Sequence, residues 1–212
     1  MIEITRKEFE RYSIMGKLFH PDQIMSGLID IISEIGPTKF LRGAGFNKER
    51  DAFIGVLFCY AIRKWSQREW FIQQIQDPPD FYVISPTDRS IKERPVDRIG
   101  VELVEIIDES IDLAISTLER TKLSNYFPSE GTALLIFINS KISILNLKEF
   151  SLWIVRNKEK FSSFSEVYIL FMGTSYQEIG MNYTLVNVLK AWSQCCILKD
   201  EFGNGVLFPH CL

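Results

Sequence analysis

The sequence predicts an α/β fold with a mixed central β-sheet flanked by helices. β-prone segments alternate with helical segments from residue 99 to residue 172, and this alternation is typical of right-handed parallel crossovers. Another β-prone run, residues 81–84, can pair antiparallel with the strand that follows it. The 212 residues are 46% hydrophobic and 24% charged, which is the composition of a globular chain with a buried core.

Two helical segments precede the predicted sheet. After Pro21, apolar residues recur at three- and four-residue spacing over residues 24–35, as on an amphipathic helix. Residues 38–46 contain glycines and are predicted to form a connection. Asn47 suits the N-cap of a second helix that runs to about Trp65, and its nearly continuous apolar middle predicts burial.

The remaining elements alternate along the chain. Strands are predicted at residues 81–84, 99–106, 132–138 and 167–172, and helices at residues 109–123, 146–161 and 183–193. The strand at 132–138 is apolar after its first residue, which is typical of a strand covered on both faces. We therefore expect helices on both sides of the sheet.

Charge and hydropathy exclude several classes of protein. Lys and Arg number 24 against 27 Asp and Glu, so a net charge of −3 excludes histone-like binding through bulk positive charge. The longest apolar stretch, residues 53–62, is well short of the roughly 18 residues that cross a bilayer. The first residues mix charges and lack the apolar middle of a secretory signal, and the four cysteines do not suggest a disulfide framework. We expect a cytoplasmic protein with no membrane contact.

Two carboxylates are placed where a metal site can form. Asp80 precedes the predicted strand at 81–84, and Glu102 lies within the predicted strand at 99–106. Antiparallel pairing of these strands would bring both side chains to one rim. Mg²⁺ prefers oxygen ligands and usually takes one or two protein carboxylates together with water and phosphate oxygens. The pair therefore suits metal-assisted hydrolysis of phosphodiesters.

The order of these features resembles a known family. Pro79 and Asp80, then Glu102 in the next strand, then a helix and a buried strand are similar to the PD-(D/E)XK superfamily of restriction-endonuclease-like nucleases, over residues 47–140. The resemblance implies that Asp80 and Glu102 hold Mg²⁺ or Mn²⁺ and that an acidic residue on the preceding helix assists them. Glu49, near the start of that helix, is our choice for this residue, and Glu69 is the alternative.

The resemblance also implies an organisation of the whole chain. We expect one domain over residues 1–212, with a restriction-endonuclease-like core at 47–174. Residues 1–46 would form an N-terminal helical addition, and residues 175–212 a C-terminal addition.

One position departs from the family pattern. The family has a lysine two residues after the acidic strand residue, where this chain has Val104. Glu105 points to the other face of the strand and cannot substitute without a bulge. Some members of the family carry the lysine on another element, and Lys122 on the following predicted helix is the candidate here. A cation on the attacking water and the phosphate is worth about 10²–10⁴ in rate. A catalytically degenerate fold that serves as a nucleic-acid-binding or assembly module is therefore the alternative function.

Partners follow from two further features. A basic segment beside the carboxylate pair is placed to contact DNA or RNA phosphates, although interleaved acidic residues also fit a solvated loop; its cations are Arg89, Lys92, Arg94 and Arg98. Aromatic residues make up 13% of the chain. Four of them are expected to be exposed and favour a homodimer: Trp70, Phe71, Phe161 and Phe164.

Overall fold

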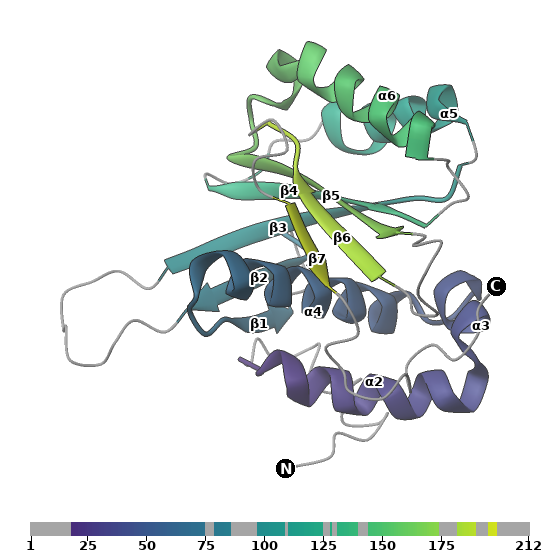
Figure 1. The fold of residues 1–212 in the computed structure, drawn as a ribbon, viewed down its shortest axis with the longest axis vertical. Coiled ribbons are helices and arrows are strands. Elements are labelled where there is room, and N and C mark those ends of the chain that lie inside the picture. Colours follow the sequence, from purple (N-terminus) through teal and green to yellow (C-terminus); the bar gives the residue numbers. More distant parts are fainter. Residues whose placement is uncertain are drawn as a thin grey trace.

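A seven-stranded β-sheet forms the centre of the protein, in a computed structural model that describes residues 18–74, 79–85, 97–108, 110–124, 128, 131–139, 144–173, 182–189 and 195–198. The strands lie side by side in chain order (Figure 1). They are β1 (Phe71–Gln74), β2 (Phe81–Ser85), β3 (Asp97–Ile106), β4 (Thr132–Ile138), β5 (Glu166–Gly173), β6 (Asn182–Asn187) and β7 (Cys195–Leu198). The predicted class, a mixed sheet flanked by helices, is confirmed.

The type of strand pairing changes twice across the sheet, from antiparallel to parallel and back to antiparallel. β1, β2 and β3 form an antiparallel meander, as predicted for β2 and β3. β3, β4 and β5 are parallel to one another, and β5, β6 and β7 are again antiparallel. The helices α5 (Ile111–Leu118) and α6 (Ile144–Arg156) supply the two crossovers that parallel pairing requires.

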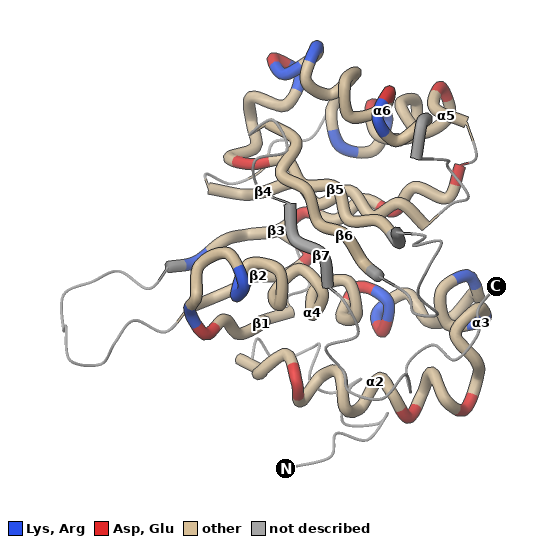
Figure 2. Tube along the Cα trace, viewed as in Figure 1, with Lys and Arg blue, Asp and Glu red and all other residues tan. Residues whose placement is uncertain are grey.

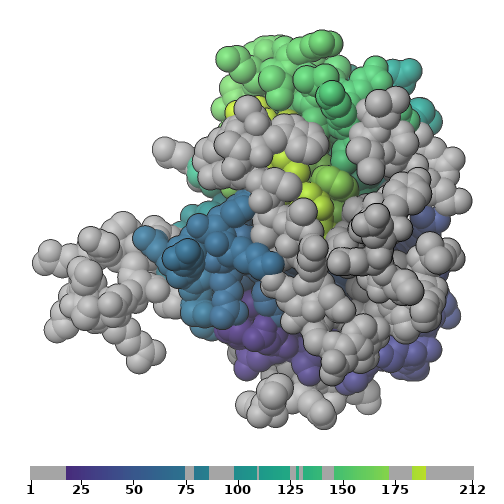
Figure 3. Space-filling model, in the orientation of Figure 1, coloured from purple at the N-terminus to yellow at the C-terminus, as the bar shows by residue number. Residues whose placement is uncertain are grey.

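Helices cover both faces of the sheet (Figure 1). One layer contains α2 (Pro21–Ile35), α3 (Pro37–Arg42) and α4 (Asn47–Ser66), and the other contains α5 and α6 with the short helices Glu119–Leu123 and Lys158–Phe161. Figure 3 shows the green atoms of α6 at the opposite end of the molecule from the purple atoms of α2. Two apolar clusters result because side chains alternate along each strand: Leu135 packs in the α4 cluster, and Leu134 in the α5–α6 cluster.

The buried helix α4 anchors its layer to the sheet. The Phe58 ring lies 6.4 Å from the Phe81 ring of β2 and 5.1 Å from the Tyr168 ring of β5, measured between centroids. Gly55 brings the helix close to the sheet, since a Cβ there would lie 3.6 Å from the Phe81 ring. The side of α4 that carries Gly55 and Phe58 therefore faces β2. The helix ends at Ser66, and its C-cap residue Gln67 has a left-handed φ of 54°.

The strand β4, in the middle of the sheet, carries no charge. In Figure 2 the tube of β4 carries no charged residue, in agreement with its sequence TALLIFI and the burial of every one of its residues. Among the described helices, none has the length and hydropathy needed to span a membrane.

The structure corrects several predicted elements. The helix predicted at 183–193 was wrong over its described part: β6 occupies Asn182–Asn187, because Tyr183 and Leu185 are buried while the strand pairs with β5, and residues 190–193 lie outside the described residues. The predicted connection at 38–46 contains α3, and the short strands β1 and β7 were not predicted. The helix predicted at 109–123 is α5 continued by a π-helical turn.

The prediction that Trp70, Phe71, Phe161 and Phe164 are exposed was wrong. Trp70, Phe161 and Phe164 are at most 5% exposed, and Phe71 is half-buried. Trp70 donates a hydrogen bond from its indole N–H to Ser66, and Phe161 packs edge-on against Trp153. Trp70, Phe161 and Phe164 are therefore part of the core and do not support a homodimer.

Candidate active site

Asp80 lies where β2 separates from β3. The pairing of these strands ends at Phe81 and Val101, and Asp80 is the residue before Phe81. Its Oδ2 accepts a hydrogen bond of 2.7 Å from the backbone N–H of Leu103. The side chain thus satisfies a strand N–H that β2 leaves behind, and this bond fixes the Asp80 carboxylate beside Glu102.

Lys122 joins Asp80 to Glu102. Its Nζ lies 2.6 Å from Oε2 of Glu102 and 3.5 Å from Oδ2 of Asp80. The Glu102 side chain is only 2% exposed, and that of Lys122 is 15% exposed. The structure therefore brings three of the residues singled out in the sequence to one place, at the edge of β3. Their catalytic roles stay predictions.

A π-helical turn carries Lys122 to this position. α5 runs on into Glu119–Leu123, and the N–H of Ser124 bonds to the carbonyl of Glu119 over 2.9 Å. Leu118 is buried in the α5–α6 cluster. Lys122 lies about one turn later and therefore on the same side of the helix, which faces the sheet. Single π turns inside helices occur frequently at functional sites.

The two carboxylates retain oxygens that suit a divalent cation. Oε1 of Glu102 is buried and makes no hydrogen bond to any described residue. Both contacts of Asp80, with Leu103 and Lys122, fall on Oδ2. No group of three or more His, Cys, Asp or Glu in the described ranges is arranged to hold a metal, whereas Mg²⁺ commonly takes one or two carboxylates. The donor set therefore fits a cation that completes its shell with water and substrate oxygens.

Asp51 is a fourth charged group near this site, and the sequence did not indicate it. It lies on α4 one turn before Gly55, which faces the ring of Phe81, the residue after Asp80. Burial raises the pKa of Asp51 to about 6; the charges of Asp80 and Glu105 also raise it, while those of Arg50 and Lys122 lower it. The effect of the Asp80 charge on the pKa of Asp51 indicates that this carboxyl lies near the candidate site.

Asn at position 51 should stabilise the protein at neutral pH. A carboxyl whose pKa is raised from 3.8 to about 6 favours folding below pH 4, and this contribution is lost as the pH rises through 6. Asp51→Asn should therefore raise the free energy of unfolding by about 1–3 kcal/mol at pH 7.5 and by about half as much at pH 5. Urea denaturation at both pH values measures this. The exposed Asp30 of α2 supplies the control Asp30→Asn, and equal effects of the two variants would contradict the assignment.

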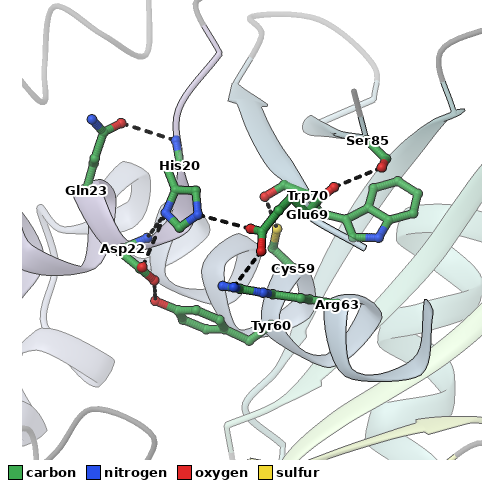
Figure 4. A network of polar contacts seen from close by, with 9 residues as sticks. All are labelled: His20, Asp22, Gln23, Cys59, Tyr60, Arg63, Glu69, Trp70 and Ser85. Atoms are coloured by element: carbon green, nitrogen blue, oxygen red, sulfur yellow. Dashed lines mark hydrogen bonds and ion pairs between the residues drawn. The ribbon is translucent and has the colours of Figure 1, made fainter. Parts of the chain in front are cut away.

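Glu49 and Glu69, the two acidic residues considered from the sequence, lie elsewhere. Glu49 is two residues from Asp51, about 200° around the helix, and shares its face with Phe53, whose ring packs against those of Phe40 and Tyr183. Glu69 accepts from Arg63 over 2.6 Å and contacts His20 Nε2 at 3.3 Å (Figure 4).

A pocket of about 700 Å³ lies between α2 and the end of α4, apart from the carboxylate pair. It is lined by residues that include Asp22, Tyr60, Arg63 and Glu69. The Tyr60 hydroxyl donates to Asp22 over 2.5 Å, and Arg63 pairs with Glu69, so these charged groups bind one another (Figure 4). We therefore assign no reaction to this pocket.

The other predicted site residues are placed as follows. Val104 is 6% exposed and packs in the α5–α6 cluster, on the same strand face as Glu102. Arg98 is exposed at the start of β3, and its guanidinium carbon lies 3.3 Å from the centroid of the Tyr82 ring. Arg89, Lys92 and Arg94 lie outside the described residues.

Comparison with known proteins does not indicate a family for this chain. No protein-family model matches the chain, and no curated protein matches it significantly.

Proposed function

We propose that this chain is a metal-dependent nuclease that hydrolyses phosphodiester bonds of DNA or RNA. The observation that carries the proposal is the contact of Lys122 Nζ with both Glu102 and Asp80. It supplies a lysine beside the two carboxylates although Val104 occupies the usual lysine position. The order of α4, an antiparallel meander, α5 and a buried parallel strand also supports the proposal, since the sequence resemblance rests on the same order.

The site residues have distinct tasks in this proposal. Asp80 and Glu102 would hold Mg²⁺ or Mn²⁺, which when bound polarises a phosphoryl oxygen and lowers the pKa of water. The Lys122 ammonium donates hydrogen bonds and offsets the negative charge that develops on the phosphate. Asp51, with a pKa of about 6, is suited to accept a proton near neutral pH. Leu103 N–H keeps Asp80 in place through its hydrogen bond.

Glu102→Gln tests the proposal because it removes one negative charge and keeps the shape of the side chain. We expect Mg²⁺-dependent cleavage of single- or double-stranded DNA or RNA by the wild type and a loss of at least about 10²-fold in the variant. The matched control is Glu119→Gln, since Glu119 also pairs with a lysine, Lys160, over 2.6 Å, but at the surface. This control should cleave at the wild-type rate.

A degenerate nuclease fold that acts as a binding or assembly module is the second candidate. The buried Val104 favours it, because the lysine position of the family is filled by an apolar core residue. The close pair of Lys122 and Glu102 is then a structural ion pair. In that case the wild type and Glu102→Gln are equally inert with Mg²⁺ and with Mn²⁺, and the nuclease proposal fails.

A further inference from the structure

The face of the sheet that carries Glu102 continues along β3 to an exposed arginine. Arg98, Gly100 and Glu102 are alternate residues of β3 and therefore point to one face. Gly100 pairs with Tyr82 of β2, and a Cβ on Gly100 would lie 3.3 Å from Cε1 of Tyr82. The Tyr82 ring thus uses the space that the glycine leaves, between Glu102 and Arg98.

Arg98 lies over the Tyr82 ring. Its guanidinium carbon is 3.3 Å from the ring centroid, which is a close cation–π contact, and the Arg98 side chain is exposed. Stacking of this kind holds the guanidinium as a plane above the strand pair. A guanidinium plane offers two features at once, a flat π surface and a positive charge.

Within the described part of the chain, this part of the sheet face is at least partly exposed, since Tyr82 is half-buried and Arg98 is exposed. α4 packs against the other face of β2, through Phe58, Gly55 and the ring of Phe81. Among the described elements, α5 and α6 cover the Glu102 face farther along, in the apolar cluster that begins at Val104. The face beside Tyr82 and Arg98 is therefore continuous with the proposed active site.

We propose that Tyr82 and Arg98 form a stacking platform that binds an unpaired nucleotide of the substrate strand, so that the enzyme acts on single-stranded nucleic acid. This inference rests on the proposed function. Unpaired bases stack on arginine planes and aromatic rings, whereas bases in a duplex are already stacked on each other. Glu102 follows Arg98 by four positions, about 13 Å along the strand, so the platform binds the chain a few nucleotides from the bond that is cut.

Binding of labelled oligonucleotides tests the platform without cleavage. Fluorescence anisotropy in EDTA compares a single-stranded oligonucleotide with its duplex, using the whole chain. Arg98→Ala and Tyr82→Leu should each weaken single-strand binding about tenfold, in line with the stacking of one base, and leave duplex binding within about twofold. Arg156→Ala removes a charge from an exposed arginine of α6 and should leave both affinities unchanged.

Arg98→Lys separates stacking from simple charge. Lysine keeps the positive charge and loses the plane, so we expect most of the tenfold loss to persist. Wild-type affinity in Arg98→Lys, or equal losses on single strand and duplex, would overturn the platform and indicate a phosphate contact. Unchanged binding in Arg98→Ala would also overturn it, even if cleavage still depends on Glu102. A chain that shows the expected losses of single-strand binding but never cleaves would support the platform and refute the proposed nuclease activity.

Discussion

Replacing Lys122 with methionine should lower the free energy of unfolding by about 3–5 kcal/mol, because removal of one partner leaves a buried charge uncompensated. Glu102 is 2% exposed, and its Oε2 has Lys122 Nζ at 2.6 Å. The lost ammonium should also reduce cleavage by about 10²–10⁴-fold. Urea denaturation and the cleavage assay measure the two effects separately.

The double variant Glu102→Gln/Lys122→Met shows whether the stability loss comes from the uncompensated carboxylate. With both charges removed, most of the lost stability should return, while cleavage stays absent. Lys160→Met is the surface control, because both side chains of the Lys160–Glu119 pair are about 40% exposed. It should change stability by less than about 1 kcal/mol. A Lys122→Met protein as stable as this control would contradict the buried-pair interpretation.

Alanine at position 100 should inactivate the site without touching any charged residue. A Cβ on Gly100 would lie 2.9 Å from Cγ of Pro79 and 3.2 Å from Oγ1 of Thr132. Pro79 is rigid and precedes Asp80, so its displacement moves the Asp80 carboxylate. A shift of about 1 Å in a catalytic group costs on the order of 10² in rate, and the overpacking costs about 1–3 kcal/mol of stability.

Gly55→Ala is the matched control for this change. A Cβ there lies 3.6 Å from the Phe81 ring, an ordinary contact, and alanine favours the helix over glycine by about 1 kcal/mol. This variant should therefore fold at least as stably as the wild type and cleave normally. Full activity in Gly100→Ala would show that the position of Asp80 does not depend on the packing of Pro79.

The sequence predicted the centre of the fold because local patterns there agree with the tertiary environment. β4 is apolar after Thr132 and was predicted with its observed bounds, since a strand covered on both faces has no polar side. β6 was mistaken for a helix because its apolar residues also fit helical spacing, and only pairing with β5 decides between the two. The four-residue β1 is too short to show a period.

The sequence also predicted only part of the candidate site. Asp80 and Glu102 were identified because strand pairing follows from sequence order, and Lys122 because the usual lysine is missing. Asp51 was missed since its place near Asp80 depends on how α4 packs, through Gly55, against Phe81. Glu49 was chosen for its place near the start of the same helix, with Glu69 as the alternative, and only the orientation of α4 distinguishes Glu49 from Asp51.

The most direct test of the nuclease proposal is cleavage by the wild-type chain as a function of Mg²⁺ or Mn²⁺ concentration, with Glu102→Gln measured beside it. We expect activity that requires the ion, is abolished by EDTA and is lost in Glu102→Gln but not in Glu119→Gln. Cleavage that Glu102→Gln retains would contradict the nuclease proposal, because the activity would then belong to another site. So would a wild type that is inert on DNA and RNA at every concentration of either ion.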